Sequence, residues 1–349
     1  MIDQALIYLW VSLGLTMVFF IAILCAWTYS YLSKRSDARV IETLNNLFSD
    51  YMDTHNVKQQ QAKDQIGQYI QRGSRRKELF IKLLIQHRDE HREEHDEQLI
   101  LLIQQTKIHG YLEKMLLSKS VYKQALACRY AGDINIQSLR DLVYKLIKSE
   151  SNVVVYHVLL ALSKLGDLNR LSESLYANAN NINLSFRAVV EVLSVFTGSK
   201  EELFKATIEH SDNYIKGVLI KMAVDQQCEG LMDYYIQFLS STDKNLKIAC
   251  VRAIAQCEGE ANEQQLIDCL DDEMWEVRAA AAKGLENIGT KKSFESLSRG
   301  VSDKEWWVRQ NAAVALVSIP GGMDYAKKII DGKDRYASEA ILGVLAKTS

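Results

Sequence analysis

A repeat of 31 residues in the C-terminal part of the chain constrains the fold more than any other feature. Leu246, Val277 and Val308 follow one another at this interval. Small or apolar residues recur 4, 5, 8 and 11 positions after each of them, at Cys250, Val251, Ile254 and Cys257, at Ala281, Ala282, Leu285 and Ile288, and at Ala312, Ala313, Leu316 and Ile319. These offsets trace one stripe of an α-helix. Because one such helix cannot bury its stripe alone, the repeat predicts a stacked array of units.

Each unit is predicted to be an antiparallel pair of helices. The short stretches 263–272 and 292–303 precede two of the stripes and favour a first helix. Asp272 and Asp303 lie where a turn meets the second helix, and a carboxylate there can accept the first backbone N–H groups of that helix. The pattern continues backwards with weaker identity. About seven to eight pairs fit into 113–349, which we take as the repeat domain.

Composition excludes a sheet-rich fold. Proline, which cannot continue a helix, occurs once, and good helix formers dominate. The six cysteines include no Cys-x-x-Cys pair, which favours free thiols in a reducing compartment. The formal net charge of -2 provides no field that would attract nucleic acid. We therefore predict an all-α protein that does not bind nucleic acid.

Two segments resemble HEAT repeats of the short, phycobilisome-lyase-like type. They are residues 271–289 (DDEMWEVRAAAAKGLENIG) and 302–321 (SDKEWWVRQNAAVALVSIPG). Both contain an Asp, a Val-Arg pair, two small residues, a Leu and a closing Gly. The resemblance implies a right-handed α-solenoid with a concave surface that binds proteins.

One position of the repeat carries basic residues: Lys216, Lys247, Arg278 and Arg309 follow at steps of 31, and Ser185 interrupts the series. The resemblance implies that the two arginines bond an Asp of a neighbouring turn. We therefore favour a structural role over ligand contact for them.

Near the N-terminus the sequence predicts a transmembrane helix. No residue between Asp3 and Lys34 is charged, and roughly 20 apolar residues are enough to cross the hydrocarbon core. No basic segment precedes the apolar stretch, as one would in a signal peptide. We expect an uncleaved anchor at 1–33 that contacts the membrane through residues 4–33.

Topology follows from the residues that flank this anchor. Lys34, Arg35 and Arg39 lie after it, whereas only Asp3 precedes it. Positively charged flanks stay in the cytoplasm. We expect a single-pass protein of the inner (cytoplasmic) membrane with its C-terminal domain in the cytoplasm.

Residues 34–112 are polar and favour helices, which predicts a cytoplasmic helical spacer. Gly73 and Ser74 are expected to interrupt the helix within a basic cluster. Such a cluster is typical of a solvated face and less often contacts anionic headgroups. The apolar clusters 79–85 and 99–103 fit either a coiled coil between two copies or packing on the first repeat. Oligomerisation through the spacer stays open.

Three spacer histidines, His87, His91 and His95, share one helix face because they are four residues apart. With Glu90 and Glu94 they match the inverted zincin pattern. A catalytic zinc site needs a third protein ligand and a dry cavity, whereas this stretch is highly charged. We interpret it as a solvated face, with metal binding or pH sensing as alternatives. No metal site, cofactor or catalytic residue is predicted.

A candidate partner surface follows from the position just before the stripe. Trp307 lies there, and its equivalents in the earlier repeats should approach the inner face. The candidate surface consists of Tyr214, Lys221, Asn245, Arg252, Glu276, Lys283, Trp307, Gln310 and Asn311. Mixed charges, amides and aromatic rings favour a polypeptide partner over a phosphate backbone.

These features together predict a membrane-anchored interaction scaffold or assembly factor. It would present a HEAT-like surface to a cytoplasmic or membrane protein, in an envelope machine. The alternative is a HEAT-like lyase or metal-dependent enzyme that uses the solenoid groove or the face formed by His87, His91 and His95. The sequence has no Gly-rich phosphate loop, and His157 and His210 lack the adjacent Glu of HEAT-like metal hydroxylases. We therefore expect no enzymatic activity.

Overall fold

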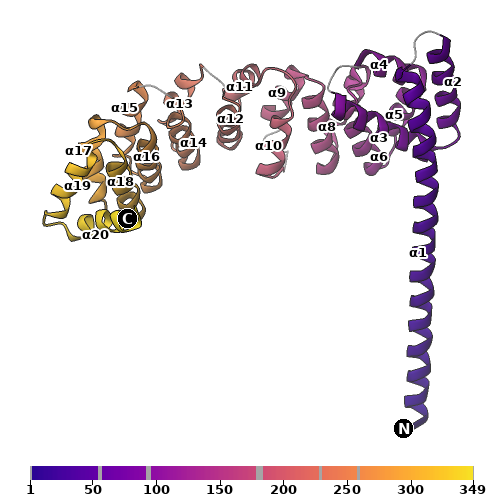
Figure 1. Cartoon of the computed structure of the whole chain (residues 1–349), viewed down its shortest axis with the longest axis horizontal. Coiled ribbons are helices and arrows are strands. Elements are labelled where there is room, and N and C mark those ends of the chain that lie inside the picture. Colours follow the sequence, from indigo (N-terminus) through magenta and orange to yellow (C-terminus); the bar gives the residue numbers. More distant parts are fainter. Residues whose placement is uncertain are drawn as a thin grey trace. The chain divides into compact units, whose positions relative to one another are not determined.

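The computed structural model describes residues 2–53, 57–91, 96–177, 184–227, 230–257 and 260–348. Within these ranges every regular element is a helix, with twenty α-helices, three short 3-10 helices and no strand. The chain forms two compact units, Met1–Leu142 and Val143–Ser349 (Figure 1). The all-α prediction is confirmed.

The first unit contains one helix much longer than the others. Its helices are α1 (Ile2–Asp53), α2 (Val57–Gln71), α3 (Ser74–His91), α4 (Asp96–Gln105), α5 (Ile108–Leu116) and α6 (Val121–Asp133). α1 runs without interruption for 52 residues. It includes a stretch that is long and apolar enough to cross a membrane. The mean hydropathy of this stretch is 1.9, and none of it is buried.

The C-terminal part of α1 packs against α2 and α3. Leu44, Phe48 and Tyr51 are buried at helical spacing and so line one face of α1. The hydroxyl of Tyr51 donates to the carbonyl of Gln98 at 3.0 Å. The apolar segment and the beginning of the spacer are therefore one helix, held in the unit by its second half.

The spacer folds within the first unit. α2 ends at Gln71 and α3 begins at Ser74, so the interruption predicted at Gly73 is confirmed. Its apolar clusters supply buried side chains, namely Leu79, Phe80, Ile81, Leu84, Leu99, Leu102 and Ile103. The unit also includes α5 and α6, which extend past residue 112.

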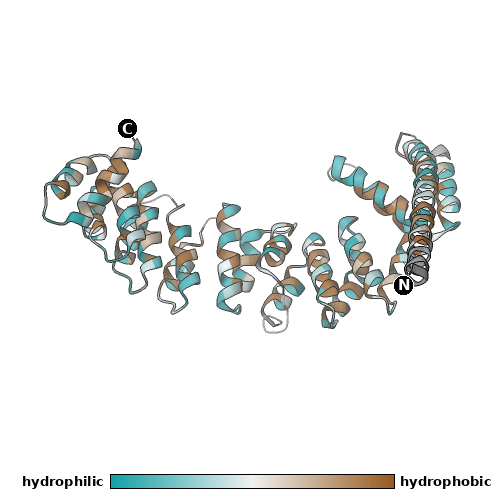
Figure 2. Cartoon of the chain, turned by 90° about the horizontal axis from the view of Figure 1, so that it is seen from below, coloured by the Kyte–Doolittle hydropathy of each residue, from teal (hydrophilic) through white to brown (hydrophobic). Residues whose placement is uncertain are grey.

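The second unit consists of two layers of helices (Figure 1). One layer contains α8 (Asn152–Lys164), α10 (Phe186–Ser194), α12 (Asn213–Asp225), α14 (Lys244–Ile254), α16 (Trp275–Ile288), α18 (Trp306–Ser318) and α20 (Arg335–Thr348). Each of these second helices contacts the next one. The other layer contains α9 (Leu168–Ala177), α11 (Lys200–Ile208), α13 (Met232–Phe238), α15 (Glu260–Cys269), α17 (Phe294–Val301) and α19 (Gly322–Ile330). The helices carry hydrophobic and hydrophilic residues side by side, as amphipathic helices do (Figure 2).

The stripe predicted from the repeat forms the core between the layers. Leu246, Val277 and Val308 are at most 1% exposed, and the residues 4, 5 and 8 positions later are equally buried. The eleventh position differs, because Ile319 is buried whereas Cys257 and Ile288 are only half-buried. These last residues lie at or beyond the helix ends, where the packed layer stops.

Charged side chains join the turns of consecutive pairs. The guanidinium of Arg278 donates to both carboxylate oxygens of Asp303, at 2.7 and 3.0 Å, and Lys247 lies 2.6 Å from Asp272. The predicted Arg–Asp contact is thus confirmed for Arg278. Arg309 differs, because it donates to the carbonyls of Asp303 and Lys304 within its own turn.

The two turn aspartates also accept backbone N–H groups, as predicted, but one step earlier than the first helical residues. Asp272 accepts from Met274 and Asp303 accepts from Glu305, each at 2.8 Å. Met274 and Glu305 are the N-cap residues of α16 and α18. The carboxylates therefore order the turn that leads into each helix.

Candidate functional site

The candidate site lies on four consecutive second helices, α12, α14, α16 and α18. The repeat places the same position of each helix in one row, so Tyr214, Asn245, Glu276 and Trp307 are each the second residue of their helix. Three of these side chains, those of Tyr214, Asn245 and Trp307, are exposed. Tyr214, Asn245, Glu276 and Trp307 together form the first row of the site.

Two hollows on these helices lie next to each other. The first lies between α12 and α14, the second extends over α14, α16 and α18, and each has a volume of about 580 Å³. Both are lined by Ile248, Arg252 and Gln256, so they adjoin each other at α14. We call this combined hollow the α12–α18 groove.

Eight of the 24 residues that line the two hollows belong to the predicted surface. Tyr214, Lys221, Asn245 and Arg252 line the first hollow, and Arg252, Glu276, Lys283, Trp307 and Asn311 line the second. Gln310, the ninth candidate, is half-buried and lines neither hollow. The structure therefore brings eight of the nine residues to one groove, and their role in binding stays a prediction.

A second row along the groove is basic. Lys221, Arg252 and Lys283 follow at steps of 31 residues, two helical turns after the first row, and all three are exposed. The side chains of Lys221 and Arg252 make no hydrogen bond or ion pair with any residue that the structure describes. Lys283 lies 3.3 Å from Glu286. Two of the three cations are therefore available to a partner.

Two of the acidic groups in the groove are already engaged. Glu276 pairs with Lys244 at 2.7 Å, and this hydrogen bond lowers the pKa of the Glu276 carboxyl. Asp243 accepts from the backbone N–H of Leu246 at 2.8 Å and so caps α14. A backbone amide does not neutralise a carboxylate, so Asp243 and Asp225 stay negative and the groove carries unpaired charges of both signs.

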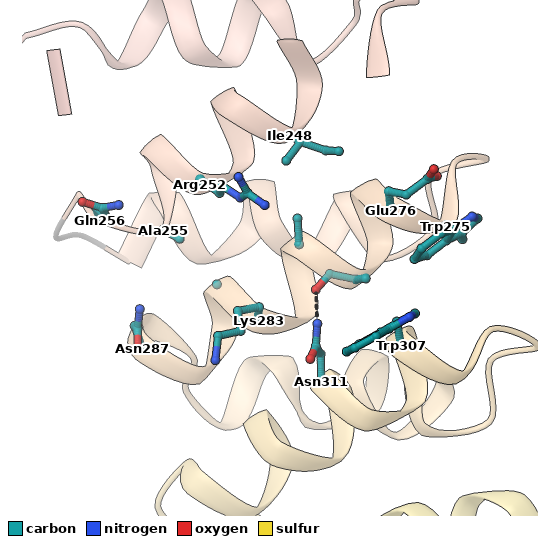
Figure 3. A pocket seen from close by; sticks show the side chains of 13 residues that line it. Ile248, Arg252, Ala255, Gln256, Trp275, Glu276, Lys283, Asn287, Trp307 and Asn311 are labelled. Carbon is teal, nitrogen blue, oxygen red and sulfur yellow. Dashed lines mark hydrogen bonds between the residues drawn. The ribbon is translucent and has the colours of Figure 1, made fainter. Parts of the chain in front are cut away.

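Aromatic rings and a fixed amide occupy the α18 side of the groove. Trp307 is 57% exposed, and its ring meets that of Trp306 edge-on, with centroids 4.6 Å apart. The Nδ2 atom of Asn311 donates to the carbonyl of Ala279 at 2.9 Å, which fixes the side chain over α16. Figure 3 shows Trp275 and Trp307 at one end of this hollow, with Gln256 and Asn287 at the other.

Some lining residues were not in the predicted set. Gln256 and Asn287 lie one helical turn after Arg252 and Lys283 and are also 31 residues apart, so the repeat step could have found them. Half-buried Trp275 lines the groove as well.

The histidine-rich helix is part of the first unit. The ring of His87 lies edge-on against Phe48, with centroids 4.9 Å apart, and stacks on the ring of His91 at 4.1 Å. His95 lies outside the described residues. Among the residues that the structure describes, no group of three or more His, Cys, Asp or Glu side chains has the arrangement of a metal site.

Two helices of the groove, α16 and α18, lie in a segment that matches a known sequence family. A family model described as HEAT repeats matches residues 263–340, which span most of α15 to α20. None of the curated proteins matches the sequence. The matched segment includes the groove residues Glu276, Lys283 and Trp307. The second unit is therefore a helical solenoid whose C-terminal pairs are similar to HEAT repeats.

Proposed function

We propose that the protein is a membrane-anchored scaffold that holds an extended, acidic segment of a partner protein in the α12–α18 groove. HEAT repeats in general mediate interactions between proteins. The observation that carries the proposal is the row formed by Lys221, Arg252 and Lys283 along the α12–α18 groove. In this proposal the protein is not an enzyme, and α1 confines it to the membrane.

The geometry of the repeat suggests a spacing for the partner segment. Helices packed side by side lie about 8–10 Å apart, and an extended chain advances about 3.3 Å per residue. One helix of the groove therefore corresponds to about three residues of an extended partner. Acidic side chains at every third position would meet the basic row in register.

The remaining lining favours a polypeptide over nucleic acid. Asp225, Asp243 and Glu276 lie in the same groove as the three cations. A phosphate backbone, with a charge on every nucleotide, would approach these carboxylates. A polypeptide can place neutral residues opposite them and an apolar side chain against Trp307, and tryptophan is enriched among residues that dominate binding energy.

A binding measurement with designed peptides tests this proposal. The full chain in detergent is titrated with a fluorescent peptide that has Asp at every third position, and anisotropy gives the dissociation constant. We expect Arg252→Glu to weaken binding by roughly tenfold or more, because the variant places like charges together. Arg252→Lys should retain most of the affinity.

Matched controls separate the groove from general charge effects. Arg299→Glu makes the same reversal on α17, in the layer of first helices, and should leave binding unchanged. A peptide of the same composition with its Asp residues clustered should bind less tightly. Equal affinity of Arg252→Glu and the unmodified protein would contradict the proposal. Tighter binding of single-stranded DNA than of the peptide would contradict the choice of partner.

A further inference from the structure

Basic side chains lie on α1, just beyond its apolar segment, and on the corner that is paired to it through Arg75 and Asp37. Some belong to α1 itself and the others to the corner between α2 and α3, and all but one are exposed. We call this group the basic collar, which consists of Lys34, Arg35, Arg39, Arg72, Arg75 and Arg76. The two parts of the collar are separated in sequence by more than thirty residues and are brought together by the fold.

An ion pair fixes where the corner between α2 and α3 lies along the length of α1. The Nε and Nη2 atoms of Arg75 lie 3.2 and 2.5 Å from the two carboxylate oxygens of Asp37. Asp37 follows Leu32, the last residue of the apolar segment, by five residues, which is about 8 Å along a helix. The headgroup layer on each side of the hydrocarbon core is about 5–8 Å thick. If α1 spans a membrane, the corner therefore lies at headgroup depth.

The rest of the α2–α3 hairpin extends away from this level. Near the start of α2, the side chain of Gln59 donates to the carbonyl of Tyr51 at 3.3 Å. Near the end of α3, the ring of His87 contacts Phe48. Both ends of the hairpin thus lie beside the C-terminal part of α1. The corner reaches back to the residues that follow the apolar segment.

Most of the charge on the collar is not neutralised within the protein. Arg75 occupies Asp37 and also contacts Glu78 at 3.5 Å. Arg76 rests on the ring of Tyr69, 4.2 Å from its centroid, which holds the guanidinium in place without cancelling its charge. Four cations make no hydrogen bond or ion pair with any described residue through their side chains, namely Lys34, Arg35, Arg39 and Arg72.

We propose that the basic collar binds the headgroups of anionic phospholipids, with Arg72 and Arg76 adding to the cations of α1. The proposal rests on the membrane span that we have proposed for α1. Each basic side chain at the surface of an anionic leaflet contributes to binding, and the contribution falls off within a Debye length. The ion pair between Arg75 and Asp37 positions the corner, so the folded unit contacts the membrane in one orientation.

Lipid titration of the full chain tests the collar. The protein is purified in a non-ionic detergent, phosphatidylglycerol or phosphatidylcholine is added, and bound lipids are counted by native mass spectrometry. We expect phosphatidylglycerol to bind more tightly than phosphatidylcholine. The double variant Arg72→Gln/Arg76→Gln should weaken phosphatidylglycerol binding by about tenfold, because two charges are lost. The variant Arg72→Lys/Arg76→Lys should restore it.

The matched control is Lys327→Gln/Lys328→Gln on α19, which likewise removes two cations, one of them resting on the ring of Tyr325. It should bind lipid like the unmodified protein. Equal binding of the two lipids, or an unchanged affinity in the Arg72→Gln/Arg76→Gln variant, would overturn the proposal. So would displacement of the lipid by an equal concentration of inorganic phosphate. Extraction of the protein from membranes by alkaline carbonate would instead contradict the span of α1.

Discussion

At the scale of single residues, buried or half-buried charges join elements that the chain separates by about 25 to 30 residues. Arg278 is 8% exposed and binds Asp303, while its Nη1 atom donates to the carbonyls of Asp272 and Glu273. Burial acts to raise the pKa of Asp303. The hydrogen bonds from Arg278 and from the Glu305 amide outweigh it, so the pKa lies below its usual value.

A buried carboxylate on α15, that of Glu263, likewise joins its helix to the next pair. Glu263 is 1% exposed and accepts hydrogen bonds from the amide of Thr290 at 2.6 Å, from the Thr290 hydroxyl at 2.9 Å and from the hydroxyl of Ser293. Burial acts to raise its pKa, and these hydrogen bonds lower it below the usual value. Glu263 thus orders the turn that follows α16.

We predict that Arg278→Met destabilises the turns around α16 and α18 by roughly 2–3 kcal/mol, because Asp303 and two carbonyls lose their donor. Hydrogen exchange of the α18 amides measures this loss. A lowered pKa stabilises the fold fully above the unfolded value of about 4 and ceases to do so as the pH falls through the folded value. The difference between variant and unmodified protein should therefore be equal at pH 7 and pH 5 and smaller at pH 3. An undiminished difference at pH 3 would contradict the role of the ion pair.

At the scale of elements, the two parts of α1 differ in what surrounds their apolar side chains. Its first part carries exposed apolar side chains such as Phe19 and Trp27, which are 69% and 66% exposed. Its second part buries Leu44 and Phe48 against α2 and α3. A continuous helix transmits orientation along its length, whereas a flexible linker would not. The part of the first unit that packs around the second half of α1 is therefore attached rigidly to the apolar segment.

We expect Phe48→Ala to destabilise the packing of α1 on α2 and α3 by about 3–4 kcal/mol, since a large buried ring leaves a cavity. Phe48 is 5% exposed and meets the ring of His87. Hydrogen exchange of the α2 and α3 amides should rise strongly, while that of α16 to α18 stays unchanged. The matched control is Phe19→Ala, at an exposed position of the same helix. Equal effects of the two substitutions in detergent would contradict this division of α1.

At the scale of the whole molecule, the groove depends on repetition. Each second helix contacts the next one, so a position that faces outward on one helix lies beside its equivalents on the neighbours. Stability in such arrays is roughly the sum of the repeats and the interfaces between neighbours. Four helices are needed to place Tyr214 and Trp307 in one groove with Arg252 between them.

The proposed topology has a direct test. A reporter that is active only in the cytoplasm, fused after Ser349, should be active, because Lys34, Arg35 and Arg39 follow the apolar segment. A reporter that is active only outside the cytoplasm should be silent at the same position. The reverse pattern would contradict the orientation, and activity of the second reporter would also remove the basis for a cytoplasmic partner.

Much of the second unit could be predicted because its information is local. The apolar offsets of the stripe are set by the geometry of one helix, and the structure buries Leu246, Val277 and Val308 as the pattern indicates. The 31-residue step likewise placed Lys221, Arg252 and Lys283 in one row. Gln310 is half-buried and lines neither hollow, because the repeat step states which face a residue occupies and not how exposed it is, and its role in binding stays a prediction.

The sequence by itself therefore determined that the chain is helical, that its C-terminal part repeats, and that an uncharged apolar segment precedes it. The tertiary structure decided which distant side chains meet: Glu263 with Thr290 and Ser293, and Arg75 with Asp37. Periodicity reports the direction of a side chain relative to its own helix. Contacts between helices depend in addition on where each helix ends and how it packs, which no local pattern specifies. For this reason the rows of residues along the groove could be predicted from the sequence, whereas the basic collar could be identified only from the tertiary structure.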